Sequence, residues 1–103
     1  MVAFYNSIGA AQSLAQAFVD PINSILPTGT NRAASVQKAD NTVGSTMNLG
    51  ELREPYNLNI PSVLLENGFH DNPNEVEFLV TNQQLLAETI GSVIVDFYNL
   101  ELM

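Results

Sequence analysis

The stretch that decides the fold of this chain is residues 61–72, which read PSVLLENGFHDN. Within it, Ser62 to Leu65 is a short apolar run, bounded by a proline on one side and by Glu66 and Gly68 on the other. A short apolar run between turn-forming residues is typical of a buried β-strand. We therefore expect a strand whose carboxyl end presents the Glu66 carboxylate. The glycine close behind it allows another backbone or a ligand to approach.

Helices are expected downstream of this strand. The sequence Asn72-Pro73-Asn74-Glu75 is typical of a helix start, with a capping asparagine, a proline in the first turn and a glutamate that reaches back to the cap. A second start of the same kind is at Thr81 to Gln84. Apolar residues at helical spacing then predict a helix over residues 82–98, packed on a sheet that contains residues 62–65. These apolar residues are Leu86, Ile90, Val93, Ile94 and Phe97.

Upstream, shorter elements and a long connection are expected. Leu49 to Arg53 is interpreted as a strand, and Pro55 to Asn59 as a turn. Residues 28–48 are mostly polar, which predicts a loop that holds at most a short strand near Val36. A loop of this length in a small domain is typically either functional or mobile.

The amino-terminal quarter predicts a strand followed by a helix. Residues 2–5 are apolar and β-prone, and Asn6 or Ser7 is a candidate helix cap. Apolar positions then recur at helical spacing as far as Ile25. Pro21 leaves two alternatives open, one kinked helix or a second short helical turn that begins there. The residues that would end the element in either case are Pro27 and Gly29.

Helices and strands follow one another along the chain, which predicts an α/β fold. We expect a partial mixed sheet of short strands with packed helices and a closing C-terminal helix. The length of 103 residues suits one small domain over residues 1–103. The expected strands are fewer than a complete sheet needs, so an exposed sheet edge is available for pairing with a second copy of the chain.

Charge and composition exclude several classes of function. The chain has three basic and eleven acidic residues, for a net charge of −8, so nucleic acid and anionic membranes are unfavourable partners. There is no cysteine and the only histidine is His70, which excludes thiolate chemistry and leaves no obvious transition-metal site. The longest mainly apolar run, Ile90 to Tyr98, is too short to span a membrane and is interrupted by Asp96. The N-terminus lacks the features of a signal peptide.

The stretch 61–72 resembles a segment of the N-acetylmuramoyl-L-alanine amidase family. That segment reads proline, small, apolar, leucine, apolar, glutamate, any residue, glycine, phenylalanine, two variable residues and asparagine. Other parts of the chain resemble the family in the same order, and the resemblance covers residues 3–99. The chain is thus similar to the C-terminal half of a bacterial zinc-dependent amidase domain. The further matching positions are Phe4-Tyr5, Ser13-Leu14-Ala15, Leu49 to Arg53, Glu75, Leu79, Leu86-Ala87, Ile90, Ile94 and Tyr98.

This resemblance implies a peptidoglycan hydrolase of the cell wall, acting in the extracellular or periplasmic space. The reaction it implies is cleavage of the amide between N-acetylmuramic acid and L-alanine. Glu66 would be the catalytic residue beside a zinc ion, taking a proton from water and later handing it to the leaving amine. The family's zinc ligands are two histidines and a glutamate, all upstream of where this chain begins. Phe4-Tyr5 match the strand that follows the second of these histidines.

Two positions qualify this resemblance. Asn67 stands where the family is usually apolar, and His70 falls on a variable position, so no ligand role is carried over to it. No metal ligand is therefore assigned in this chain, and no zinc is expected in the chain alone. The residues that would bind substrate stay unassigned.

Other interpretations of these residues and of the whole chain are also compatible with the sequence. Glu66 is also compatible with a strand-end carboxylate paired with Arg53, and His70 with a surface loop histidine. Asn72 is better explained as a helix cap than as a substrate contact. The missing zinc ligands favour a non-catalytic remnant or interaction module derived from the same fold. A third interpretation is an unrelated acidic α/β protein that matches the family by chance.

Overall fold

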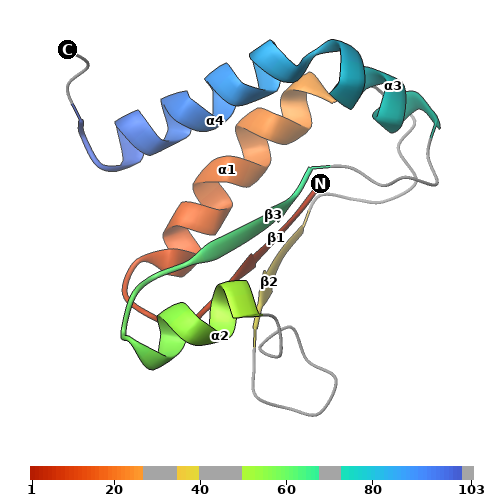
Figure 1. Cartoon of the computed structure of the whole chain (residues 1–103). Helices are drawn as coiled ribbons and strands as arrows, with labels where there is room; N and C mark the ends of the chain where they lie inside the picture. Colours follow the sequence, from red (N-terminus) through yellow and green to blue (C-terminus); the bar gives the residue numbers. More distant parts are fainter. Residues whose placement is uncertain (27–34, 40–49, 68–72, 101–103) are drawn as a thin grey trace.

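A computed structural model of the chain describes residues 1–26, 35–39, 50–67 and 73–100 (Figure 1). Their elements follow the order β1-α1-β2-α2-β3-α3-α4. No helix within these ranges is both long and apolar enough to cross a membrane. Several positions discussed above lie outside the described residues: Pro27, Gly29, Leu49, Gly68, His70 and Asn72.

A mixed sheet lies at the centre of the fold and confirms the predicted α/β class. β1 (Val2–Tyr5) is the middle strand, with β2 (Ser35–Lys38) parallel to it on one side and β3 (Val63–Glu66) antiparallel on the other. The strands predicted at residues 2–5, near Val36 and before Glu66 are therefore all present. β3 differs in one respect. It is an edge of the described sheet, and its apolar side chains are half-buried rather than buried.

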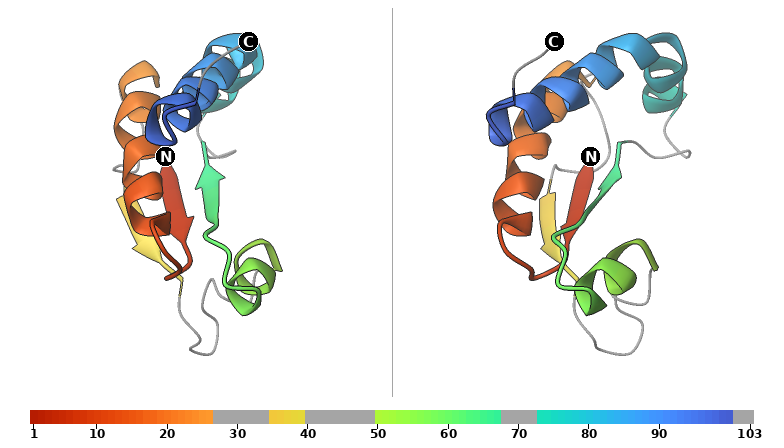
Figure 2. Two further views of the ribbon diagram at one scale, coloured as in Figure 1. Left: turned by 90° about the vertical axis from the view of Figure 1, so that its left-hand side faces the viewer. Right: turned by 60° about the vertical axis from the view of Figure 1, so that its left-hand side comes forward.

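α1 (Ala11–Ile25) covers one face of the sheet and supplies much of the core (Figure 2). It continues through Pro21, so the single-helix alternative is the correct one. An internal proline costs about 3 kcal/mol. The buried stripe of α1 extends past the proline to Ile22, which is fully buried, and this burial offsets the cost. Leu26 is extended, as is typical of a residue that precedes a proline. The buried residues of α1 are Ala11, Ala15, Phe18, Val19 and Ile22.

The start of α1 corrects the predicted helix cap. Neither Asn6 nor Ser7 caps the helix, because α1 begins later, after Ala10, and no side chain caps it. The connection from β1 turns at Gly9, whose φ of +52° favours glycine. A Cβ at Gly9 would also lie only 3.2 Å from Pro61 Cγ, so the turn is packed tightly against the segment that leads into β3.

Residues 50–57 form a helix, α2 (Gly50–Asn57), where the sequence predicts a strand and then a turn. Only Leu58 and Asn59 remain as a turn. Leu52 is fully buried, and Tyr56 packs with it on the second face of the sheet. A helix brings these two residues one turn apart over the same small cluster, whereas in a strand they would be about 13 Å apart. Tertiary packing thus decides the local structure here. The rest of this cluster is Phe4, Ala39 and Leu64.

Two helices close the chain, separated by a break at Asn82. α3 (Pro73–Thr81) begins at its proline, as the sequence predicts, and α4 (Gln83–Phe97) is the closing helix. The second predicted cap, at Thr81, is wrong. Its Oγ1 donates to the carbonyl oxygen four residues earlier at 2.7 Å, and Asn82 Nδ2 donates to the Phe78 carbonyl oxygen at 3.1 Å. Both side chains therefore finish α3 rather than start α4.

α4 packs mainly against α1 and not, as predicted, directly on the sheet. Val93 is its buried residue, and Leu86 and Ile90 pack against the same core. Ile94, which the sequence places in the packing stripe, is 38% exposed. α1 already covers the sheet, so α4 contacts a convex helix through a narrow stripe, and Ile94 falls at the margin of that stripe.

Replacing Val93 with alanine is expected to lower the free energy of unfolding by about 1–2.5 kcal/mol, because two buried methyl groups are lost. Ile94→Ala removes more carbon from an exposed side chain and is expected to cost less than about 1 kcal/mol. Both changes remove a β-branched residue from the same helix, so the gain in helix propensity is similar. Urea denaturation of the two variants measures the difference. A larger loss for Ile94→Ala would show that the packing face of α4 is a different one.

Candidate functional site

Glu66 is the last residue of β3, and its side chain is exposed. Its partner in the antiparallel ladder is Val2, at the start of β1. Successive side chains of a strand point to opposite faces. Leu65 packs against the core beneath α1, whereas Leu64 packs on the second face, so Glu66 shares the second face with Leu64. The carboxylate thus stands at the carboxyl end of β3, beside the amino end of β1, on the face that α1 does not cover.

The neighbours of Glu66 test the alternative interpretation, in which Glu66 is a strand-end carboxylate paired with Arg53. Arg53 forms an ion pair with Glu54, between Nε and Oε1 at 3.3 Å, on the exposed surface of α2. A pair between Arg53 and Glu66 is not found among the described residues. Asn67 is half-buried, and its enclosed Oδ1 accepts no hydrogen bond within the described part of the chain. A polar atom in this situation costs free energy, so the Asn67 amide is unfavourable at this point.

Asn6, directly after β1, is completely buried and joins β1 to the segment that leads into β3. Its Nδ2 donates to the Ile60 carbonyl oxygen and to Ser62 Oγ, both at 2.9 Å. Its Oδ1 accepts from the backbone N–H of Ser62 at 3.1 Å and from that of Ile8 at 3.3 Å. The backbone N–H of Asn6 donates to the Ser62 carbonyl oxygen at 3.2 Å. Both ends of the amide are therefore used to hold two distant segments together.

These hydrogen bonds fix the register of β3 against β1. A slip of one residue would break them and would turn Glu66 to the opposite face of the sheet. β3 has only 4 residues with half-buried apolar side chains, so packing alone specifies its register weakly. Sequence reasoning missed this role of Asn6 because Ile60 and Ser62 lie 54 and 56 positions further along the chain. No local signal distinguishes such an asparagine from a helix cap.

The described residues contain no group of three or more histidine, cysteine, aspartate or glutamate side chains that is able to hold a metal ion. His70, the only histidine, lies outside them. The zinc ion that the resemblance implies therefore has no ligand set in this part of the chain. Of the residues expected to act in the site, the structure describes Glu66.

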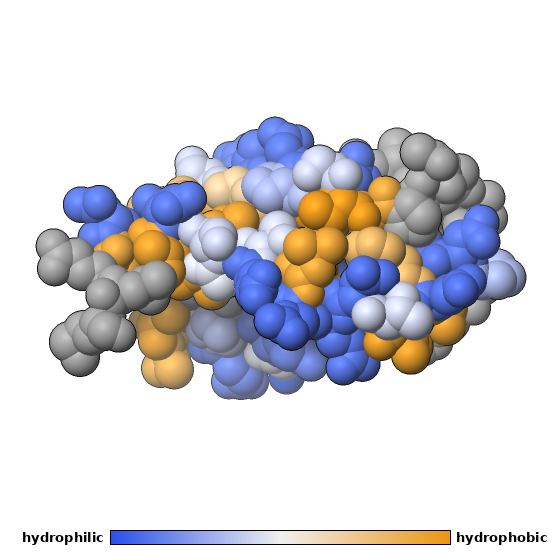
Figure 3. All heavy atoms as spheres, turned by 90° about the horizontal axis from the view of Figure 1, so that it is seen from above, coloured by the Kyte–Doolittle hydropathy of each residue, from blue (hydrophilic) through white to orange (hydrophobic). Residues whose placement is uncertain are grey.

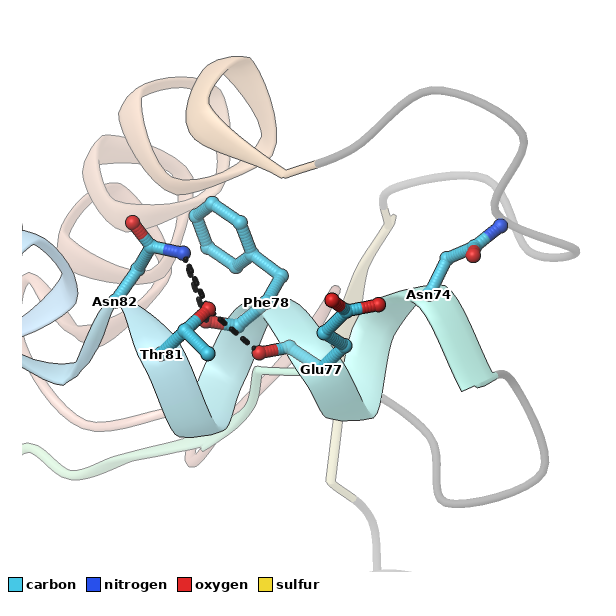
Figure 4. A pocket seen from close by; sticks show the side chains of 5 residues that line it. All are labelled: Asn74, Glu77, Phe78, Thr81 and Asn82. Atoms are coloured by element: carbon cyan, nitrogen blue, oxygen red, sulfur yellow. Dashed lines mark hydrogen bonds between the residues drawn. The ribbon is translucent and has the colours of Figure 1, made fainter.

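Glu66 does not line either of the following two surface hollows. One, of about 210 Å³, lies at the opposite end of the sheet, where β1 and β2 end and α1 begins. The other, of about 280 Å³, lies on α3 (Figure 4). There Thr81 and Asn82 bond back to carbonyl oxygens of α3, and Phe78 packs against the core, so few polar groups remain for a ligand. The residues that line the first hollow are Tyr5, Asn6, Ser7, Gly9, Gln12 and Lys38.

Comparisons of the chain with models of protein families, with curated proteins and with solved structures found no match. The functional interpretation of Glu66 therefore depends on the resemblance of residues 61–72 and on the position of its carboxylate in the fold.

Proposed function

We propose that this chain carries the general base of a peptidoglycan hydrolase of the N-acetylmuramoyl-L-alanine amidase type, and that Glu66 is this base. The observation that supports it most is the register that pairs Val2 with Glu66. By resemblance, the second zinc histidine of the family precedes the strand that β1 matches. A chain that runs into β1 passes the carboxyl end of β3, so a group carried just before β1 would lie near the Glu66 carboxylate.

In the proposed reaction, Glu66 takes a proton from the water that attacks the carbonyl carbon of the amide between N-acetylmuramic acid and L-alanine. The carbon–nitrogen bond then breaks, and Glu66 hands the proton to the leaving nitrogen, which regenerates the carboxylate. Two features of Glu66 suit this role. Its side chain is open to water and substrate, and its backbone is held in the ladder with Val2, which fixes the point in the fold from which the side chain extends.

Zinc, peptidoglycan as the substrate, and a place in the cell wall, extracellular or periplasmic, belong to this proposal through the resemblance alone. The described residues do not by themselves fit a zinc site. We therefore assign to this chain the base and part of the wall of the substrate groove, and no step that depends on the metal.

The chain alone is expected to release no peptide from purified cell walls, whereas the chain joined to an amino-terminal amidase half is expected to release it. That half would carry the two histidines and the glutamate of the family. A lone carboxylate contributes roughly 10²–10⁴-fold, far below the roughly 10⁶-fold that is the least enzymes achieve. The assay measures released peptide and bound zinc for both proteins, with the amino-terminal half alone as control. Activity of the isolated chain, or a folded and zinc-loaded joined protein that stays inactive, would overturn the proposal.

A non-catalytic interaction module derived from the same fold is the second candidate. The observation that favours it is an acidic, apolar-lined groove between α1 and α4, on the side of the sheet away from Glu66. The same assay separates the two candidates, because an interaction module gains no hydrolytic activity when it is joined to the zinc-binding half.

A further inference from the structure

A groove follows the crossing of α1 and α4. It consists of two adjoining hollows of about 380 and 280 Å³, which share Pro21, Val93 and Asp96 as lining residues. We call it the α1–α4 groove. Each hollow is much larger than the roughly 30 Å³ that a water molecule occupies, so each has room for an apolar side chain. The apolar lining comes from both helices and consists of Ala17, Pro21, Leu85, Val93 and Phe97.

Every charged side chain on the described residues of α1, α3 and α4 is acidic. Two of them, Glu88 and Asp96, line the groove, and both are exposed. Seen from above, the surface shows apolar patches bordered by hydrophilic side chains (Figure 3). Of the basic residues, Lys38 and Arg53 belong to β2 and α2. The other acidic residues of the three helices are Asp20, Glu75 and Glu77.

We propose that the α1–α4 groove docks a basic amphipathic segment of a partner protein. Apolar side chains of that segment enter the two hollows over Val93. Its lysine or arginine head groups pair with Glu88 and Asp96, while their aliphatic stems lie along exposed apolar surface such as Leu85, which is 42% exposed. The groove thus offers an apolar anchor and a charge pattern in one place.

The charge of the helical layer argues against other occupants. A second copy of the chain that docked through the same face would bring the same acidic helices against Glu88 and Asp96, and like charges that meet across an interface disfavour association. An anionic membrane surface is repelled for the same reason. Complementary charge therefore points to a basic protein segment.

The groove is independent of the proposed catalytic site. α1 covers one face of the sheet, whereas Glu66 lies on the other face with Leu64. A segment docked between α1 and α4 leaves the face of Glu66 open. Docking at the groove is therefore testable without any assay of hydrolysis.

The test uses the full chain and a synthetic amphipathic peptide of lysine and leucine, with the leucines at helical spacing. Titration calorimetry is expected to give saturable binding of one peptide per chain, weakened when salt is raised from about 50 mM to about 500 mM. Chemical-shift changes of backbone amides are expected to concentrate at Ala17, Val93 and Phe97. A peptide of glutamate and leucine with the same pattern serves as the control and should not bind.

Two pairs of substitutions separate the groove from overall charge. Glu88→Gln with Asp96→Asn is expected to weaken binding about five- to tenfold at low salt. Glu51→Gln with Glu54→Gln removes the same charge from exposed positions on α2 and should change binding less than about twofold. Ser92→Trp, at an exposed lining residue, fills the groove and should weaken binding at low and at high salt.

Three results would overturn the proposal. Equal weakening by the two charge pairs would mean that the peptide responds to net charge and not to the groove. Shift changes spread over the whole chain, with several peptides bound, would mean the same. Sedimentation that shows the free chain as a dimer, dissociated by Ser92→Trp, would identify a second copy as the occupant.

Discussion

In the protein joined to an amino-terminal amidase half, Glu66→Gln is expected to lower the rate of peptide release by roughly 10²–10⁴-fold. The amide of glutamine matches the carboxylate in shape and is unable to accept the proton of the attacking water. Folding and zinc content should stay those of the parent, because Glu66 is exposed at a strand end and, within the described residues, belongs to no group that holds a metal. The measurement is the rate of peptide release at a fixed zinc content.

The matched control for this variant is Glu51→Gln, the same change at an exposed carboxylate on α2. It should leave the rate unchanged. If Glu66→Gln also runs at the parent rate while both proteins hold zinc, Glu66 is a structural residue and the role of base assigned to it is wrong. Loss of zinc together with loss of rate would equally contradict a role as base alone.

Asn6→Ala is expected to lower the free energy of unfolding of the chain by about 2–4 kcal/mol. The change leaves the Ile60 carbonyl oxygen, the Ser62 hydroxyl and two backbone N–H groups without their partner in a part-buried site. A small domain has about 5–15 kcal/mol of stability at most, so this loss is a large share. Urea denaturation with an unchanged m-value measures it.

Two further variants test this account of Asn6. Asn23→Ala makes the same change at an exposed position of α1 and should stay within about 0.5 kcal/mol of the parent. Asn6→Asp keeps an oxygen that accepts from Ser62 and Ile8, yet it replaces the donor to Ile60 and Ser62 with a carboxylate oxygen in a completely buried position, so it should cost at least as much as Asn6→Ala. A loss below about 0.5 kcal/mol for Asn6→Ala would mean that water replaces the amide and that the register of β3 is fixed by other contacts.

Patterns that depend on neighbouring residues predicted the structure well. Pro73 begins α3, residues 2–5 form β1, and the apolar run before Glu66 forms β3. In each case the signal lies within a few residues of the structure that it specifies. The signal is the fixed φ angle of a proline, a run of β-prone side chains or a helical spacing of apolar residues.

Predictions failed, or left two alternatives open, where one local pattern fits two structures. Residues 50–57 suit a strand or a helix, and packing of Leu52 and Tyr56 on the second face of the sheet selects the helix. The sequence left open whether Pro21 lies within one helix or begins a second helical turn, and burial as far as Ile22 selects the single helix. Helical spacing places Ile94 in the predicted apolar stripe of α4. The packing of α4 on α1 nevertheless leaves Ile94 exposed.

By itself, the sequence determined the α/β class, the acidic charge and the position of Glu66 at the end of a strand, because these follow from composition and short-range pattern. Only the tertiary structure decided what surrounds that carboxylate. The pairing of Glu66 with Val2 and the hydrogen bonds of Asn6 to Ile60 and Ser62 join residues more than fifty positions apart. The α1–α4 groove likewise exists only where two distant helices cross. Contacts of this kind depend on how whole elements pack, and no window of local sequence encodes them.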